Sequence, residues 1–480
     1  MKNLKIFVRR VVILTIFPFL LLSPLFFYNL SGYTLVDFDE AWYGEIARNI
    51  LTWRNPFVLS FNEVPYTDHP PLGFILIAIS ELIFGVNEFA VRFPSALCGF
   101  GSLILTFLIG KKLFSRVIGL GAMFILASSV WFILRSRQGD LDTILLFFYL
   151  LTLYLALKVK ENYNFIFAVS ISFALLLSTK SFFGLTIIPT IVTIFLIYRI
   201  KISLKKLAFG LIIFTIIIAF WLVPNYAKYK LGFISHIVQV GLKPDRRQPI
   251  NFGEIHRSLT LVYLHYGIRK WYYPAIFSMA ICTLFVFKHK NLLILYTWTL
   301  IPTYGFLTSS KTEIWHLIPI YPALALFTSF TTLNIATLLI KKLTRLPINI
   351  CRNTADVLGL LFFVLTSSTF IFNFRNAVKL FGRERHPLTQ VASFAKNYKE
   401  PLFITSDLTV PATAIFYSQK RVRVVGNELP PVNTIPSLLE FGPKPFLLIT
   451  EGWRLKLDKV DKTRYRVLKQ VADYQLLLVN

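Results

Sequence analysis

Long apolar runs alternate with short polar segments over most of the chain. The apolar segments fall at 11–30, 72–86, 92–113, 117–134, 141–157, 163–178, 182–199, 207–224, 273–288, 292–309, 314–332 and 356–373. Most are close to the ~20 residues that a helix needs to cross a bilayer. The pattern therefore predicts an all-α, polytopic membrane protein.

One of these segments, 72–86, fits a crossing helix poorly. It contains Glu81 and begins at Pro70-Pro71, and apolar runs of about 15 residues are more often interfacial or re-entrant than spanning. If it does not cross, basic clusters such as 199–206 and 341–352 fall on the cytoplasmic side, as the positive-inside rule expects. This topology predicts about 11 crossings, with an uncleaved first helix and an extracytoplasmic C-terminus.

Two extracytoplasmic loops of this topology carry unusual charge. The loop 31–91 concentrates carboxylates after the first helix, whereas the loop 225–272 is rich in cations on the side where few are expected. The cations are Lys228, Lys230, Lys243, Arg246, Arg247, Arg257, Arg269 and Lys270. Either the topology differs at this point or these cations bind an anionic ligand. The basic clusters that fix both neighbouring helices favour the ligand.

The composition changes after about residue 373. Strand-like runs follow at 401–405, 421–425, 445–450 and 474–480, with a short helix candidate at 411–418. This alternation predicts a small α/β extracytoplasmic domain. We therefore expect a transmembrane domain at 1–373 and an α/β domain at 374–480.

Composition and charge agree with a membrane protein. Hydrophobic residues make up 55% of the 480 residues, charged residues make up 16%, and the net charge is +27. Cytoplasmic loops and anionic headgroups explain this excess better than nucleic acid does, so no nucleic-acid partner is expected. Cys98, Cys282 and Cys351 show no CxxC spacing, which argues against a disulfide framework or a zinc site.

The predicted extracytoplasmic loops combine carboxylates with cations. Acidic residues lie in 31–91 and 135–142, and basic residues lie in 178–184, 225–272 and 309–316. Transfer of a sugar from a phosphate needs a base for the acceptor hydroxyl and cations for the leaving phosphate. The loops therefore fit a glycosyltransferase that uses a sugar phosphate donor.

Asp39 and Glu40 follow the first helix and are the candidates for the base. A carboxylate in a partly dry pocket can take the acceptor proton. The alternative is an ordinary solvated pair just past a helix end, and the spacing alone leaves both open.

Asp140 and Asp142 stand at the start of an apolar helix. There they can cap the free N–H groups of that helix. Arg135 and Arg137 crowd the same short loop, which raises the case for a functional site.

Asp68 and His69 precede a Pro-Pro pair. They are candidates for a phosphate contact or a metal site, or they simply form a rigid turn. A lone Asp-His pair is a weak metal signal because a complete site needs more ligands, so a divalent metal stays possible but unassigned. The cations that can neutralise a phosphate are Lys180, Arg269, Lys311 and His316, although Lys180 can also snorkel to the interface.

Several motifs, taken in chain order, resemble a known family. They are FDEAWYGEIARNI (38–50), YTDHPPLGFILI (66–77), FGVNEFAVRFPSAL (84–97), GDLDTILLFFYLL (139–151), TKSFFGL (179–185), RKWYYP (269–274) and SSKTEIWHLIPIYPALAL (309–326). Together they resemble the GT-C glycosyltransferases, in the branch that holds the protein O-mannosyltransferases and the bacterial aminoarabinose transferases that modify lipid A. The resemblance covers about residues 1–330.

The resemblance implies a GT-C fold, with juxtamembrane helices in the first large loop and an extracytoplasmic domain. It also implies a polyprenyl-phosphate-linked sugar donor and transfer on the far side of the membrane. By position, Asp39 resembles the catalytic acid/base, Glu40 its neighbour and Asp142 the second essential carboxylate. His69 stands where relatives often carry a phosphate-binding Lys. Trp42 departs from the Arg that follows the acidic pair in the aminoarabinose transferases.

These observations predict an inner-membrane glycosyltransferase that moves a sugar from a polyprenyl phosphate to a lipid or glycan on the extracytoplasmic face. The alternatives are a protein O-glycosyltransferase and a non-enzymatic lipid or solute transporter. The predicted catalytic residues are Asp39, Glu40 and Asp142. The predicted substrate-binding residues are Tyr43, Asp68, His69, Asp140, Lys180, Arg269, Lys311 and His316.

Overall fold

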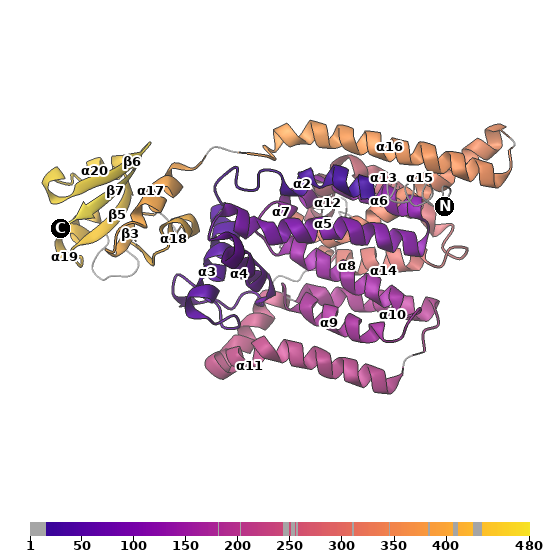
Figure 1. The fold of residues 1–480 in the computed structure, drawn as a ribbon, viewed down its shortest axis with the longest axis horizontal. Coiled ribbons are helices and arrows are strands. Elements are labelled where there is room, and N and C mark those ends of the chain that lie inside the picture. The colour runs from indigo at the N-terminus through magenta and orange to yellow at the C-terminus, as the bar shows by residue number, and fades with distance from the viewer. Residues whose placement is uncertain are drawn as a thin grey trace, which may run out of the picture. The chain divides into compact units, whose positions relative to one another are not determined.

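The computed structural model describes residues 16–480 except 181, 202, 243–248, 251–254, 256–257, 310–311, 345, 383–384, 407–410 and 426–433. The chain divides into two compact units (Figure 1). The helical unit comprises Met1–Tyr28, Thr67–Gly73 and Phe93–Leu380. The mixed unit comprises Asn29–Tyr66, Phe74–Arg92 and Phe381–Asn480. The domain boundaries expected from the sequence, 1–373 and 374–480, remain a prediction.

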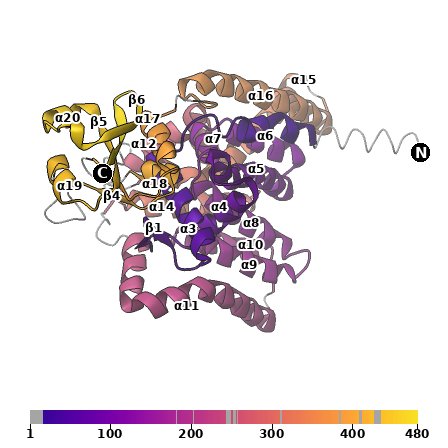
Figure 2. The same cartoon turned by 60° about the vertical axis from the view of Figure 1, so that its left-hand side comes forward.

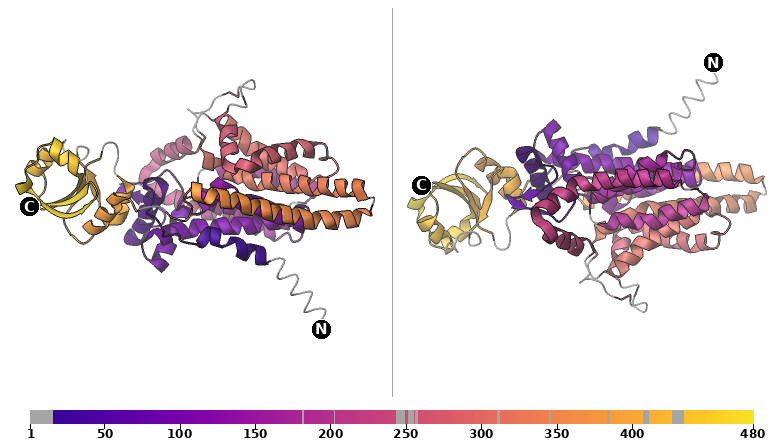
Figure 3. Two further views of the ribbon diagram at one scale, coloured as in Figure 1. Left: turned by 90° about the horizontal axis from the view of Figure 1, so that it is seen from above. Right: turned by 90° about the horizontal axis from the view of Figure 1, so that it is seen from below.

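The helical unit is built from α-helices joined by short turns. Its helices are Ile16–Phe27 with α2 (Pro24–Phe27) at its end, α5 (Glu88–Leu113, from Phe93 on), α6 (Arg116–Ala127), α7 (Val130–Ser136), α8 (Asp142–Lys158), α9 (Phe165–Leu177), α10 (Ile188–Ile197), α11 (Leu204–Leu242), α12 (Leu259–Ile268), α13 (Tyr272–Thr283), α14 (Leu292–Leu307), α15 (Tyr321–Thr344) and α16 (Ile348–Ala377). The 3₁₀ turns η2 (Phe182–Ile187), η5 (Arg269–Trp271) and η6 (Ile314–Ile320) precede α10, α13 and α15. Figure 3 shows α15 and α16 side by side along their length.

Several of these helices suit a membrane. Among the described residues, Glu88–Leu113, Leu204–Gly241, Ile314–Thr344 and Ile348–Asn376 are long and apolar enough to cross one. The pair α6 and α7, bent by 74°, is a further candidate. Shorter apolar helices of 10–17 residues accompany them. The chain is an integral membrane protein, and the number of about 11 crossings remains a prediction.

Two predicted segments differ from the observed helices. The single segment 117–134 is broken, because Ser128 and Ser129 each donate a side-chain hydrogen bond back to the Ile125 carbonyl at the break, and such bonds bend helices. The segment 207–224 continues as α11 to Leu242 through a kink at Lys230. Part of the predicted loop 225–272 is therefore helical.

The mixed unit contains a five-stranded sheet. Its strands are β3 (Leu402–Ile404), β4 (Val422–Val424), β5 (Phe446–Glu451), β6 (Arg466–Val471) and β7 (Tyr474–Val479), in the order β4-β3-β5-β7-β6. Strand β3 is parallel to β4 and β5, whereas β7 is antiparallel to β5 and β6. The small C-terminal sheet that the sequence predicted is confirmed. Strand β6 was not predicted, because both of its faces are largely exposed and carry polar residues.

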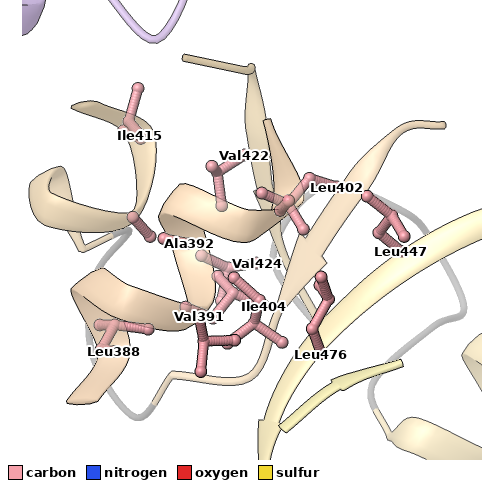
Figure 4. Packing of buried hydrophobic residues seen from close by; sticks show 13 residues of the cluster. Leu388, Val391, Ala392, Leu402, Ile404, Ile415, Val422, Val424, Leu447 and Leu476 are labelled. Atoms are coloured by element: carbon pink, nitrogen blue, oxygen red, sulfur yellow. The ribbon is translucent and has the colours of Figure 1, made fainter. Parts of the chain in front are cut away.

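Helices cover both faces of this sheet (Figures 1 and 2). On one face lie α17 (Pro387–Ala395) and α18 (Ala412–Ser418), and on the other α19 (Ile435–Phe441) and α20 (Gly452–Leu457). Alternate residues of each strand face opposite sides. Leu402 and Ile404 pack with Val391 of α17 (Figure 4), whereas Phe403 belongs to the opposite core.

Residues from the N-terminal half complete the mixed unit. They form the turn η1 (Asp37–Ala41), α3 (Trp42–Trp53), the hairpin of β1 (Ser60–Phe61) and β2 (Val64–Pro65), and α4 (Leu72–Phe84, from Phe74 on). Asn62 at the hairpin tip ties this region to the sheet, because its side chain donates to and accepts from the backbone of Val422 at 2.9 Å each. The acidic loop therefore folds together with the C-terminal sheet.

Candidate active site

A buried ion pair fixes the acidic loop of the mixed unit. Arg92 donates from Nε to Glu40 Oε1 at 2.6 Å and from Nη2 to Glu40 Oε2 at 2.9 Å. The same guanidinium donates to the carbonyls of Leu30, Tyr33 and Thr34. The side chains of Arg92 and Glu40 are 0% and 1% exposed, so this pair holds the backbone on both sides of the loop.

Glu40 also accepts a hydrogen bond from the Val36 N–H at 2.8 Å. Both of its carboxylate oxygens therefore bind groups of the protein, and it has little capacity left to take a substrate proton. The geometry gives Glu40 a positioning role beside the candidate base.

Asp39 lies between these fixed points in a strained conformation. Its φ of 62° and ψ of −76° are close to those of a γ-turn, which is rare for a residue with a side chain. The half-buried Asp39 thus differs from its neighbour in both backbone and exposure. Strain of this kind persists only where the surrounding structure enforces it, and it gathers at functional sites.

The rest of the loop is tied to the C-terminal residues of the same unit. Asp37 Oδ1 accepts from the Thr413 N–H and from its hydroxyl, both at 2.8 Å, which caps the start of α18. The Tyr417 hydroxyl accepts from the Leu35 N–H and donates to Glu88 Oε1, both at 2.9 Å. Burial and the Glu88 carboxylate raise the pKa of Tyr417 above its usual range.

A cavity of about 380 Å³ borders this loop. It is lined by Tyr33, Thr34, Leu35, Val36, Asp37, His386, Leu388, Pro411 and Thr413. A second cavity of about 360 Å³ also touches Thr34 and is lined on one side by the polar face of α17. Cavities of this size hold small ligands, and Asp39 stands only two residues after the lining residue Asp37.

Helix α3 contributes aromatic and acidic residues. The buried ring of Tyr43 packs edge-on against Phe74 with centroids 5.2 Å apart. Trp42, which replaces the family's Arg, stacks on Phe61 at 3.9 Å and so serves the packing of β1.

Glu45 is a further acidic residue of α3 that sequence analysis did not select. It lies 2.6 Å from Arg48, and only 2% of it is exposed, as is also true of Glu81 in α4. Burial raises the pKa of Glu45 to about 7, against the opposing effect of Arg48.

A second charged cluster lies in the helical unit. Arg135 pairs with Asp140 at 2.8 Å and with Asp142 at 3.0 Å, and Lys180 Nζ lies 2.6 Å from the other oxygen of Asp142. The Arg135 guanidinium also lies over the Trp315 ring at 4.6 Å. Two cations thus converge on Asp142, whose side chain is 6% exposed.

Asp140 also has the capping role that the sequence left open. Its Oδ1 accepts from the Asp142 N–H at 2.9 Å, at the start of α8. Capping and ion pairing coexist in this residue, since its other oxygen faces Arg135.

His316 stands at the start of η6. Its Nδ1 accepts from the Glu313 N–H at 3.2 Å, completing a capping box. This bond requires an unprotonated Nδ1, so the proton of the neutral ring is on Nε2. Its ring lies 6.1 Å from that of Trp315, the residue over which Arg135 lies, so His316 is near the cluster.

Asp68, His69 and Arg269, which were also predicted for the site, belong to the helical unit too. Asp68 lies 2.6 Å from His236 of α11, and both side chains are largely exposed. His69 is half-buried and Arg269 is exposed. Lys311 lies outside the described residues.

Arg92 and His236 are the contacts that the sequence-based site lacked, whereas Arg135 was noted beside Asp140 and Asp142 without a role of its own. A charged residue inside an apolar run, such as Arg92 in 84–97, is a signal that can be used, because such residues are almost always paired. His236 gave no such signal, since its partner is remote in sequence. Among the described residues, no group of three or more His, Cys, Asp or Glu is placed to hold a metal ion.

Comparisons with known proteins bear on this arrangement. The family described as "Dolichyl-phosphate-mannose-protein mannosyltransferase" matches residues 68–223. An uncharacterized protein of Aquifex aeolicus is 25% identical over 329 residues, which are 66% of this chain and 63% of that protein. The undecaprenyl phosphate-alpha-4-amino-4-deoxy-L-arabinose arabinosyl transferase of Wigglesworthia glossinidia brevipalpis is 29% identical over 205 residues, which are 40% of this chain and 35% of that protein. The matches therefore span less than two thirds of the length of these relatives.

The fold is shared with a solved structure. ArnT from Cupriavidus metallidurans bound to undecaprenyl phosphate superposes with a TM-score of 0.75 at 15% identity, covering 97% of this chain and 98% of that chain. At this identity the likeness concerns the fold. Together with the sequence matches, it confirms the predicted GT-C fold and the resemblance to the mannosyltransferase and aminoarabinose transferase family.

Proposed function

From the premise that this is a GT-C fold chain of the protein mannosyltransferase and aminoarabinose transferase family, we propose that it transfers a sugar from a polyprenyl phosphate to a lipid or glycan. Transfer takes place on the extracytoplasmic face of the cell (inner) membrane. The support for the donor class is that the arabinosyl transferase relative is named for an undecaprenyl phosphate sugar and that the ArnT structure holds undecaprenyl phosphate.

Asp39 is the base of the proposed reaction. As the acceptor oxygen bonds to the anomeric carbon and the bond to the phosphate oxygen breaks, Asp39 takes the hydroxyl proton and polyprenyl phosphate leaves. The single observation that carries this assignment is the contrast within the acidic pair. Glu40 is fully engaged by Arg92 and Val36, whereas Asp39 is half-buried on a strained backbone.

The cavity beside this loop suits the acceptor. Asp37 lines it, and Asp39 follows two residues later, a span of about 7 Å at most, so we place the acceptor hydroxyl on the Asp37 side of the cavity. Tyr33, Thr34 and Thr413, which line the cavity, carry hydroxyl groups that can form hydrogen bonds with a sugar.

Lys180 and His316 bind the donor phosphate in this proposal. An ammonium group has three N–H donors, and Lys180 directs one toward Asp142, which leaves donors for phosphate oxygens. Asp142 and Arg135 act as positioning residues for Lys180. His69 and Arg269 are proposed as further phosphate contacts from the family resemblance, with Asp68 beside them.

Two alternatives keep the same fold. A protein O-glycosyltransferase would use the same donor and base but accept a serine or threonine hydroxyl, as the family description suggests. A lipid or solute transporter would need neither base nor transfer. Detecting a glycosylated lipid, a glycosylated protein or neither distinguishes the three.

Donor protection tests the proposed function. The purified protein in nanodiscs is melted with undecaprenyl phosphate, with a polyprenyl-phosphate sugar, and with EDTA. A ligand that binds only the folded state raises the melting temperature. We expect a rise with both lipids that is lost in Lys180→Ala. No rise with either lipid at saturating concentration would contradict the proposal, and a fall with EDTA would reveal a bound metal.

A further inference from the structure

One end of the helical unit contains a cavity that the proposed reaction does not use. Its volume is about 460 Å³, and it lies among the end of α5, the start of α6, the turn before α14, and helices α15 and α16. In the predicted topology this end faces the cytoplasm, because the basic segment 341–352 lies there.

The lining of this cavity is strongly cationic. Lys288, His289, Lys290 and Arg352 contribute to it, against a single carboxylate, Asp356. Among the described residues, Lys288, Lys290 and Arg352 form no salt bridge within 4 Å. Desolvation and the charges of Lys288 and Arg352 lower the pKa of His289, so the cationic lining consists of Lys288, Lys290 and Arg352.

The turn that carries three of these residues is held in place. Asn291 donates to the Leu113 carbonyl at 2.6 Å and accepts from the Tyr198 hydroxyl at 3.1 Å. His289 packs edge-on against Phe330 of α15. Like charges are therefore kept together by the fold, although separation would relieve their repulsion.

Two exposed apolar residues stand next to the cationic turn in the chain. Phe287 is 91% exposed and Leu284 is 79% exposed, directly before the cationic turn. Exposed side chains of this kind suit the acyl region of a bilayer, whereas a soluble anion gains nothing from them.

We propose that this cavity binds the phosphate headgroup of an anionic phospholipid from the cytoplasmic leaflet. Lys288, Lys290 and Arg352 contact the phosphate, and Phe287 and Leu284 lie along the acyl chains. A phosphate group could also reach the cavity from solution, and the exposed apolar residues next to the cationic turn favour the lipid. Basic pockets between helices on the cytoplasmic side are known to suit anionic headgroups.

The test measures lipid retention by the full chain. The protein is exchanged into nanodiscs that mix phosphatidylglycerol with phosphatidylcholine, and the lipids retained after release into detergent are counted by native mass spectrometry. At roughly a fivefold affinity loss for each cation removed, the triple variant Lys288→Ala, Lys290→Ala, Arg352→Ala lowers the preference for phosphatidylglycerol about 100-fold. The matched control Lys341→Ala, Lys342→Ala removes charge from the same end of α15 without touching the lining, and it keeps the preference.

A second variant guards against misfolding of the first. Asp356→Asn removes the opposing carboxylate, so it raises the phosphatidylglycerol preference roughly fivefold. An unchanged preference in both variants would overturn the proposal. Displacement of the lipid by millimolar inorganic phosphate alone would also overturn it, because the site would then be one for a soluble anion.

Discussion

The guanidinium of Arg92 holds the carboxylate of Glu40 through two hydrogen bonds of 2.6 and 2.9 Å, with both side chains almost fully buried. Arg92 is 52 residues from Glu40 in the sequence. This pair turns one member of the acidic pair into an anchor and leaves Asp39 as the candidate base. Several measurable consequences depend on that division of roles.

Breaking the anchor costs folding stability as well as activity. Arg92→Ala leaves the Glu40 charge buried and unpaired, so we expect a loss of about 3–5 kcal/mol in the free energy of unfolding. Arg92→Lys keeps one charge but loses the paired geometry and should lose less. Unfolding in denaturant measures both. A loss below 1 kcal/mol in Arg92→Ala would contradict the role of the pair.

The variant Glu40→Gln tests whether Glu40 holds the loop in place or acts as the base. It keeps the shape of the side chain but loses the ion pair, so transfer falls chiefly because the loop is less well held. Raised temperature should worsen this variant more than the wild type. An abolished but temperature-independent activity in a well-folded Glu40→Gln protein would instead make Glu40 the base.

The proposed reaction assigns donor binding to the cluster around Asp142. Removing a charge-assisted hydrogen bond costs about 1.5–3 kcal/mol, so Asp142→Asn and Lys180→Ala should each weaken polyprenyl phosphate binding about 10- to 100-fold. Titration of the melting temperature with lipid measures the affinity. Lys180→Arg keeps the charge and serves as the control. If Asp142→Asn and Lys180→Ala bound polyprenyl phosphate as tightly as the wild type does, this cluster would be excluded from the donor site.

Glu45 makes stability depend on pH. Its pKa rises from 4.5 to about 7 by burial, so between these values the folded state binds more protons than the unfolded state. The contribution of Glu45 to stability is therefore fully present below pH 4.5 and is lost as pH rises through 7, a loss of about 3 kcal/mol at 1.36 kcal/mol per pH unit. Glu45→Gln should flatten this part of the profile.

Unfolding at pH 5 and pH 8 checks the Glu45 prediction. The exposed Glu440 of α19 provides the matched control Glu440→Gln, which should follow the wild-type profile. A Glu45→Gln variant with the same pH dependence as the wild type would show that Glu45 does not titrate in this window.

The Asp68–His236 pair should matter little for stability. Both side chains are largely exposed at 2.6 Å separation, and exposed pairs contribute about 0–1 kcal/mol. His236→Ala should therefore melt within a few degrees of the wild type.

His69 is proposed as a phosphate contact, so His69→Ala should reduce the rise in melting temperature that undecaprenyl phosphate causes. If undecaprenyl phosphate raised the melting temperature of His69→Ala as much as that of the wild type and of His236→Ala, His69 would be excluded from the phosphate site.

The elements of the fold were predictable where one local signal was sufficient. Apolar length identified the membrane helices, and short β-branched runs identified β3, β4, β5 and β7. The break between α6 and α7 was not predictable from hydropathy, because hydrogen bonds from Ser128 and Ser129 create it inside an apolar run. The number of membrane crossings depends on such bends, because a bend decides whether an apolar run crosses the membrane as one helix.

The candidate site was predictable as a set of residue types but not as a set of contacts. The sequence singled out Asp39, Asp142 and Lys180, and the structure joins the last two. Spacing alone did not distinguish Asp39 from Glu40, and only the family resemblance pointed to Asp39, because the physical distinction comes from Arg92 and from the backbone conformation of Asp39. Long-range pairing of this kind leaves no trace in local spacing.

The most direct test of the central claim compares Asp39→Asn with the wild type in one preparation. Transfer from a polyprenyl-phosphate sugar to extracted membrane lipids and glycans is followed by mass spectrometry, and undecaprenyl phosphate protection is recorded on the same protein. We predict that Asp39→Asn keeps the protection and loses transfer by about 100-fold or more, within the range of general-base contributions. Near-normal transfer by Asp39→Asn would contradict the account.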